Sequence, residues 1–284
     1  MESLANKFKK INNNINVLIS QIKKVIIIQL NYPIDFVTQI FTAVFVGLWF
    51  VFLFQSLSSG NVSESSDFGA FMVWGLVAFF FYSTALWSIG RFVRREQLTG
   101  TLESIWITPN NKNWVIISNG VGEYFIFAAA NLFIITAFSL FVKIPFNNLG
   151  MGIIILFLEF VQSIGYGLFY GALVFKIKNA NAISNLVQFG SIIICAVFFP
   201  FSVFPDWMIW ISRLHPFSWV VDSLRSNMMG KEPELINKGI WGLTALQTEI
   251  VIQILINMAL LAIGLLLFNC VKKKALVDGT LSHY

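Results

Sequence analysis

The chain has 284 residues, of which 57% are hydrophobic and 12% are charged, and its net charge is +5. Because a soluble domain carries about 25% charged residues, this composition excludes a soluble globular protein and predicts several membrane crossings. Cys195 and Cys270 both lie in apolar runs, where they provide neither a disulfide framework nor a metal cluster.

Residues 4–31 have the pattern of an amphipathic helix. Apolar residues recur every three or four positions and so share one helical face: Ile11, Ile15, Leu18, Ile22 and Val25. Lysines on the other faces favour contact with anionic lipid headgroups. Tyr32 precedes Pro33 and therefore avoids the helical conformation, which ends the helix. We expect residues 1–34 to form a cytoplasmic helix along the membrane, either a simple surface anchor or a docking strut for a partner.

Six apolar stretches that meet or approach spanning length follow, near residues 35–57, 70–90, 114–142, 151–175, 182–204 and 249–271. A membrane-spanning helix needs about 20 apolar residues. Most Lys and Arg residues fall in segments on the same side as the N-terminus, so the positive-inside rule places both termini in the cytoplasm. The predicted fold class is all-α, with residues 35–284 forming a six-span transmembrane domain. The positive charge then reports topology and gives no reason to expect a nucleic-acid partner.

The segment between the second and third spans has the sequence RFVRREQLTGTLESIWITP over residues 91–109. Three arginines lie on one side of a helix that leaves the bilayer: Arg91, Arg94 and Arg95. Gly100 permits a break, Thr101 can cap a new helix, and Pro109 stops it. Leu102, Ile105 and Trp106 give the new helix an apolar face. We expect a short transverse helix at about 99–109 that fits a groove on a soluble partner; the alternative is an ordinary positive-inside loop.

Residues 205–229 predict two short helices between the fifth and sixth spans. Pro205-Asp206 can begin the first, and Pro216 can begin the second. Asp222 and Arg225 are three positions apart and can pair. Apolar helices in this place suggest a re-entrant hairpin in the outer leaflet, and the alternative is an outer cap without a role in a pathway.

Glu159 lies near the middle of the fourth span. A carboxylate at a helix centre costs about 2.5–3.5 kcal/mol on insertion scales, so its side chain should face the bundle or a wet cavity. Two interpretations of Glu159 stay open: a functional role and an internal structural hydrogen bond. Glu123, nearer the cytoplasmic end of the third span, carries less weight.

The sequence contains no motif for chemistry of its own. It has no Gly-x-x-x-x-Gly-Lys-Ser/Thr loop, no Gly-x-Ser-x-Gly elbow and no His-Glu-x-x-His pair. We therefore expect neither an ATP site nor a catalytic residue nor a cofactor or metal in this chain.

Two segments resemble the signatures of type-2 ABC exporter permeases. Residues 94–109 are similar to that family's charged stretch, Gly-Thr-Leu-Glu and Thr-Pro between the second and third spans. Residues 215–225, HPFSWVVDSLR, are similar to a second signature in which Asn-Pro precedes a Val-Asp-Ala-Leu-Arg-like ending. Here His215 replaces the usual Asn. Together with the amphipathic N-terminus and the six spans, the resemblance covers nearly the whole chain.

The resemblance implies a role for each part. The N-terminal helix would connect to a coupling helix resting on a separate ATP-binding subunit, which binds ATP and Mg. Two six-span halves, identical or homologous, would face each other in the plasma membrane of a prokaryotic cell, with the second and fifth spans lining the path. The implied coupling residues are Arg91, Arg94, Arg95, Glu96, Gly100, Thr101, Glu103 and Pro109. The pathway candidates are Phe79, Phe80, Tyr82, Trp87, Glu159, Phe198 and Phe199, and the re-entrant motif comprises His215, Pro216, Asp222 and Arg225.

The expected function is that of a permease subunit that exports a hydrophobic or amphipathic cargo, such as a drug, a lipid or a peptide. The aromatic candidates could instead face lipid or neighbouring helices. Three other functions stay open: polysaccharide export by an ABC permease, ATP-independent secondary transport with an ion site at Glu159, and a non-transporting scaffold or immunity protein.

Overall fold

The computed structural model describes residues 2–57, 62–108, 111–177, 180–236, 239 and 242–277. Regular structure in these ranges is helical throughout, which confirms the predicted all-α class. The elements in chain order are α1 (Glu2–Asn31), α2 (Pro33–Leu57), α3 (Val62–Leu98), α4 (Leu102–Ile107), α5 (Lys112–Ser139), α6 (Leu149–Lys176), α7 (Ala180–Ile194), η1 (Phe201–Val203), α8 (Asp206–Leu214), α9 (Pro216–Met229) and α10 (Ala245–Val277).

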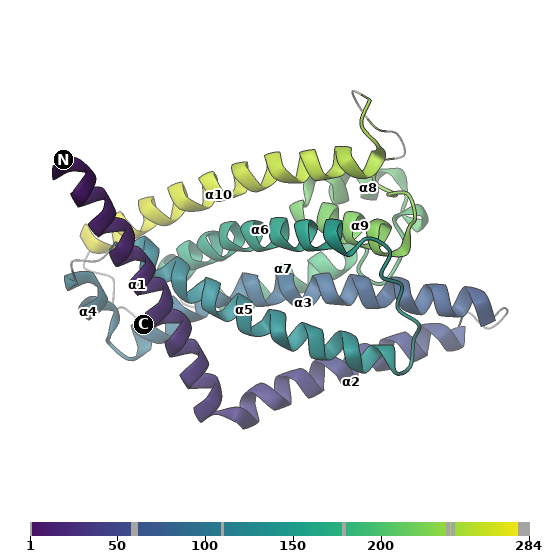
Figure 1. The fold of residues 1–284 in the computed structure, drawn as a ribbon, viewed down its shortest axis with the longest axis horizontal. Helices are drawn as coiled ribbons and strands as arrows, with labels where there is room; N and C mark the ends of the chain where they lie inside the picture. The colour runs from purple at the N-terminus through teal and green to yellow at the C-terminus, as the bar shows by residue number, and fades with distance from the viewer. Residues whose placement is uncertain are drawn as a thin grey trace.

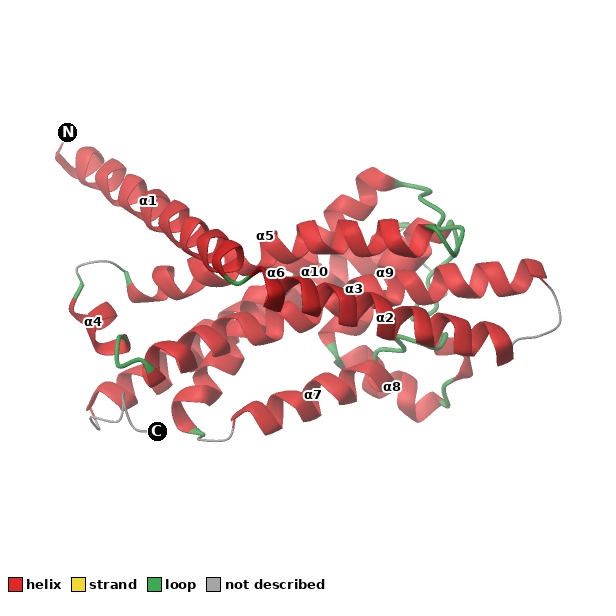
Figure 2. Cartoon of the chain, turned by 90° about the horizontal axis from the view of Figure 1, so that it is seen from below, coloured by secondary structure: helices red, strands yellow, loops and turns green. Residues whose placement is uncertain are grey.

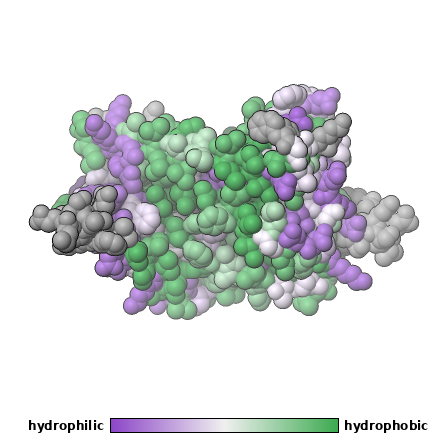
Figure 3. Space-filling view, turned by 45° about the horizontal axis from the view of Figure 1, so that its top comes forward, coloured by the Kyte–Doolittle hydropathy of each residue, from purple (hydrophilic) through white to green (hydrophobic). Residues whose placement is uncertain are grey.

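Five helices, α2, α3, α5, α6 and α10, are long and apolar enough to cross a membrane. They run side by side along the long axis of the molecule, with α3 the most enclosed of them and α2 and α10 the most exposed (Figure 1). An apolar belt covers the middle of the face seen in Figure 3, with hydrophilic residues toward its two ends. This arrangement is that of a helix bundle in a bilayer, where lipid replaces water around the outer helices.

The amphipathic helix α1 leaves the bundle at an angle and lies at the same end as α4 (Figures 1 and 2). It ends at Asn31, just before the Tyr32-Pro33 pair, as predicted, and α2 begins with Pro33. Its packed face is rotated from the predicted one, because Val25 is buried while Ile15 is exposed. The close approach of α5 sets this face, since Val25 packs on Gly122 of α5.

The six-span count is not confirmed, because the fifth apolar stretch forms only the short helix α7. After Ile194 the chain turns through Ala196, whose φ of 52° is left-handed. The amide of Ala196 donates to Ile193 O (3.1 Å) and that of Val197 to Ile192 O (3.1 Å). This pair of bonds is a Schellman motif, which ends a helix. The remaining residues of the predicted span, 195–204, contain only the single turn η1.

The other end of the bundle is built from α8 and α9 (Figure 1). Residues 217–228 of α9 are all buried, because α9 packs against α3, α6 and α10. We call this the α9 end and the opposite one the α4 end.

Candidate functional site

The turn between α3 and α4 brings the first signature together at the α4 end. Gly100 has φ +69°, a left-handed conformation that other residues rarely adopt. It lies two residues after the end of α3, with its amide donating to Gln97 O (3.1 Å) and that of Thr101 donating to Glu96 O (3.1 Å). The predicted break at Gly100 is therefore present, and it turns the chain out of α3 into α4.

Glu96 ties three helices together at this turn. Its carboxylate is buried and accepts a hydrogen bond from Lys24 Nζ of α1 at 3.0 Å. Thr101 Oγ1, just before α4, donates to the other carboxylate oxygen. Thr101 is the N-cap residue of α4, as predicted, but its side chain makes no capping hydrogen bond, since that hydroxyl bonds Glu96 and Thr99 instead. A hydroxyl forms a stronger hydrogen bond with a charged carboxylate than with a backbone amide.

Two arginines of the signature, Arg91 and Arg95, reach α5. Arg91 Nη2 lies 3.4 Å and Arg95 Nη2 lies 3.8 Å from the carboxylate of Glu123. Asn119 also donates to Glu123 at 3.3 Å. The resemblance implied that these arginines and Glu96 join the connecting and coupling helices; among the ion pairs of the described residues, Glu96 with Lys24 makes that link, and Arg91 and Arg95 bind α5 instead. The sequence signal for Glu123 was a carboxylate alone in an apolar helix, which needs a cation nearby.

Two sets of contacts thus start from the last turns of α3, and we call them together the α4 junction: Glu96 with Lys24 and Thr101, and Arg91 and Arg95 with Glu123. Arg94 is half-buried beside them.

Helix α4 presents most of its surface away from the bundle. Leu102 is buried and anchors it, whereas Glu103 is exposed and Ile107 is 85% exposed. A groove of about 370 Å³ separates α4 from α1, lined by Asn13, Asn16, Ser20, Gln21, Ile105 and Thr108 among others. Pro109 lies outside the described residues. The arrangement offers a short helix and a polar groove to a soluble partner.

The second signature begins α9. His215 is the N-cap, and its Nδ1 accepts from the Phe217 amide at 3.3 Å. Pro216 takes the first helical position, which suits its missing N–H. Asn is a favoured N-cap, so the imidazole performs here what the usual Asn would do. Burial lowers the pKa of His215 to about 4, which keeps the ring neutral and able to accept.

In the described part of the chain, Arg225 and Asp222 do not form the predicted ion pair. Each of the two side chains binds backbone groups instead. Arg225 donates from Nε to Phe71 O (3.1 Å), from Nη1 to Ala196 O (2.6 Å), and from Nη2 to Val197 O. Asp222 Oδ2 accepts from the Glu234 and Leu235 amides at 2.9 and 2.6 Å. Arg225 thereby satisfies the carbonyls freed where α7 ends, which the sequence did not reveal.

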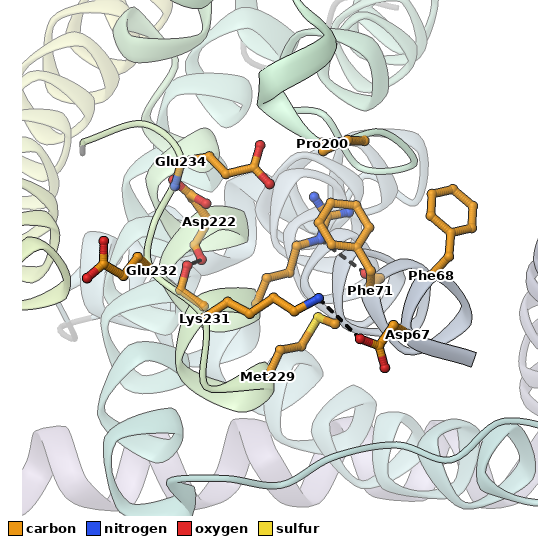
Figure 4. Close-up of a pocket in the computed structure, with 11 residues that line it drawn as sticks. Asp67, Phe68, Phe71, Pro200, Asp222, Met229, Lys231, Glu232 and Glu234 are labelled. Atoms are coloured by element: carbon orange, nitrogen blue, oxygen red, sulfur yellow. Dashed lines mark hydrogen bonds and ion pairs between the residues drawn. The ribbon is translucent and has the colours of Figure 1, made fainter. Parts of the chain in front are cut away.

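A cavity of about 330 Å³ opens beside these residues at the α9 end, and we call it the α9 cavity (Figure 4). Aromatic rings of Phe68 and Phe71 form one wall, and Glu232 and Glu234 lie on the other side. Lys231 reaches across to Asp67 at 3.4 Å. The lining also includes Pro200, Asp222, Arg225, Ser226 and Met229.

The aromatic pathway candidates lie on α3 and in the segment after α7, and they pack against neighbouring helices. Tyr82 is buried, stacks on Phe217 (4.4 Å between centroids) and hydrogen-bonds Ser191 of α7 at 2.9 Å. Trp87 donates to Gln188 of α7 at 2.7 Å. Phe79 and Phe198 are buried, whereas Phe80 and Phe199 are half-buried. The structure thus brings α3 and α7 together through polar residues of α7 that the sequence analysis did not single out.

Among the described residues, no group of three or more His, Cys, Asp or Glu is placed to hold a metal ion.

Apolar helices of spanning length packed around α3, with polar ends, define a multi-pass membrane protein. A family model described as ABC-2 type transporter matches residues 18–229, from α1 to the last residue of α9. The match spans both signature segments and most of the chain, so the protein belongs to the ABC-2 type transporter family. It is a membrane permease, and this family normally works with a separate ATP-binding subunit. No curated protein matches the chain.

Proposed function

We propose that this chain is the permease subunit of an ATP-driven exporter, with α4 as the coupling helix that rests on the ATP-binding subunit. The observation that supports this role most is the position of α4, outside the bundle yet bonded to it through the α4 junction. A partner that pushes on α4 would therefore also move the helices to which this segment is bonded.

The α4 junction supplies the mechanical link. Glu96 joins α1 and α3 to the residue before α4, and Glu123 joins α3 to α5. Both carboxylates are buried. Removing one partner of a buried charge pair costs more free energy than removing one partner of an exposed pair. Displacement of α4 is therefore passed to three helices at once.

The orientation follows from charge. Arg91, Arg95 and Lys24 all lie at the α4 end, and Lys272–Lys274 lie near the C-terminal end of α10 on the same side. By the positive-inside rule this is the cytoplasmic face, so the α9 end is the outer face and both termini are cytoplasmic. Helix α9 then re-enters the outer half of the bilayer, where its backbone is shielded by α3, α6 and α10.

A second permease half completes the path in this proposal. Helix α2 carries a large exposed apolar face that includes Phe41, Phe45 and Trp49, and α7 exposes Leu186 and Phe189. Lipid or a second, identical or homologous half would cover these faces. A path beside α3 and α7 would meet aromatic rings such as those of Tyr82 and Trp87 together with polar side chains of α7 such as Gln188 and Ser191, and this mixture suits an amphipathic cargo.

Co-purification with a charge-reversal variant tests the coupling role. The tagged chain, extracted from its native membrane in mild detergent, should bring along a P-loop ATPase in equal amount. Glu103→Arg should weaken that association about tenfold or more, which corresponds to a loss of about 1.4 kcal/mol of binding free energy. Membrane insertion should be unchanged. Glu232→Arg, an exposed charge at the α9 end, is the matched control. Normal partner binding and transport by E103R would refute the assignment of α4.

A further inference from the structure

The buried face of the first half of α10 is polar. Glu249, Gln253 and Asn257 follow one another at intervals of four and are all buried, with Glu249 0% exposed. Leu255 and Met258, which lie on other faces, are exposed and apolar. A helix with its polar face inward and its apolar face outward lines a polar interior in a membrane protein.

Helix α6 presents polar residues to the same seam. Glu159 is 2% exposed and Gln162 is also buried. The register between the helices is fixed by Asn257 Nδ2, which donates to Leu158 O at 2.8 Å, and by the packing of Leu260 on Gly165. Glu159 and Asn257 are therefore neighbours across the seam. We call Glu249, Gln253, Asn257, Glu159 and Gln162 the polar row.

The row continues to the α9 cavity through Asp222. This residue lines the cavity, and its carboxyl interacts with that of Glu249. Beyond Gln162, toward the α4 end, the seam closes, because Gly264 lies against the Gly165 carbonyl and Phe268 packs on Gly171. The row thus leads from the cavity to the middle of the bundle and stops there.

Several polar atoms of the row have no protein partner in the described part of the chain. They are both carboxyl oxygens of Glu159, both polar side-chain atoms of Gln253, and Oδ1 of Asn257. An unpartnered buried polar group costs roughly 1–3 kcal/mol by mutational data. Native proteins satisfy such groups with internal water, which needs two to four polar partners, and the row offers them.

The charged and titratable neighbours do not stabilise two carboxylates. Tyr124 of α5 faces Glu159 but donates its hydroxyl to Leu156 O at 3.2 Å. Asp222, beside Glu249, is itself acidic, and Arg225 uses its guanidinium on backbone carbonyls. Buried carboxyls without a cation are neutral acids, and two adjoining carboxyls cannot both ionise readily.

We propose that the polar row is a water-filled half-channel that binds protons at Glu159 and Glu249 and exchanges them with the solvent of the α9 cavity. With the orientation proposed above, that solvent is the external medium. The row would make the α6–α10 seam responsive to external protons, a property separate from coupling to ATP.

Infrared spectroscopy of the chain in lipid tests this directly. The native protein should show carboxylic-acid C=O bands at about neutral pH that shift on transfer to D₂O. Glu159→Gln and Glu249→Gln should each remove one band, whereas Glu232→Gln, at an exposed carboxylate, should remove none. The absence of acid bands in the native protein would overturn protonation, and bands that do not shift in D₂O would overturn hydration; neither result depends on the variants folding. Met229→Trp, at the cavity wall, should slow the shift several-fold, and an unchanged rate would overturn entry through the α9 cavity. No ATP-binding subunit is needed, so failure here leaves the coupling proposal untouched.

Discussion

Replacing Arg225 by Met removes the group that joins three segments at the α9 end. Arg225 is 3% exposed, and its guanidinium donates to carbonyls of α3 and of the turn after α7. Its Cζ also lies 3.8 Å from the centre of the Phe71 ring. Met keeps the apolar stem of the side chain but not the guanidinium, so the variant removes the charge, its hydrogen bonds and the contact with the Phe71 ring together.

The expected cost follows from these contacts. Hydrogen bonds to a charged group contribute about 1.5–3 kcal/mol each, so three represent at least about 4.5 kcal/mol. Removing the charge also relieves part of its burial penalty, and we expect a net loss of about 3 kcal/mol. At about 2 °C per kcal/mol for a chain of this size, Tm should fall by about 6 °C.

The assay is thermal unfolding in detergent, followed by the monodisperse fraction on size-exclusion chromatography. Lys231→Met is the matched control, because its pair with Asp67 joins two exposed side chains and should contribute less than about 1 kcal/mol. If R225M unfolded at the same temperature as K231M, the argument that Arg225 holds the end of α7 would be refuted.

Two further predictions concern the same region. His215 stays neutral in the folded chain because burial lowers its pKa to about 4, while the unfolded chain gains a proton below about pH 6.5. Stability is therefore full above about pH 6.5 and falls as the pH drops toward 4, so His215→Asn should lose less Tm than the native chain between about pH 7.5 and 5; equal losses would contradict this. Gly75→Ala would place a methyl against the Arg225 guanidinium and the Val197 carbonyl, and should cost about 1–3 kcal/mol. Gly190→Ala, which meets nothing within 4 Å, should be neutral or slightly stabilising, and an equal effect of both changes in thermal unfolding would be inconsistent with the packing described.

Local signals in the sequence predicted the helical elements well. The Tyr32-Pro33 pair follows the end of α1, Pro216 begins α9, Gly100 separates α3 from α4, and most of the apolar runs form the bundle. These features depend on neighbours in the chain, and they are the ones that periodicity and turn chemistry describe.

Long-range contacts decided what the sequence could not show. The fifth apolar stretch stops being helical at Ile194 because Ser212, at 2.6 Å from its carbonyl, and Arg225 satisfy the end of α7. Both residues are distant in sequence. In the same way, Glu123 lies more than twenty residues from the arginines that it binds, so nothing local identified it as a member of the α4 junction.

A cross-link from α4 to the ATP-binding subunit tests the central claim most directly. With the exposed Cys270 replaced by Ser, Ile107→Cys would carry a short thiol-reactive photoprobe, since that side chain is 85% exposed. Leu214→Cys, 81% exposed on α8 at the opposite end, is the control. The account predicts a cross-link to a P-loop ATPase from position 107, with a yield that changes on adding ATP, and none from position 214. No ATPase captured at position 107, in membranes where the chain still supports transport, would contradict it.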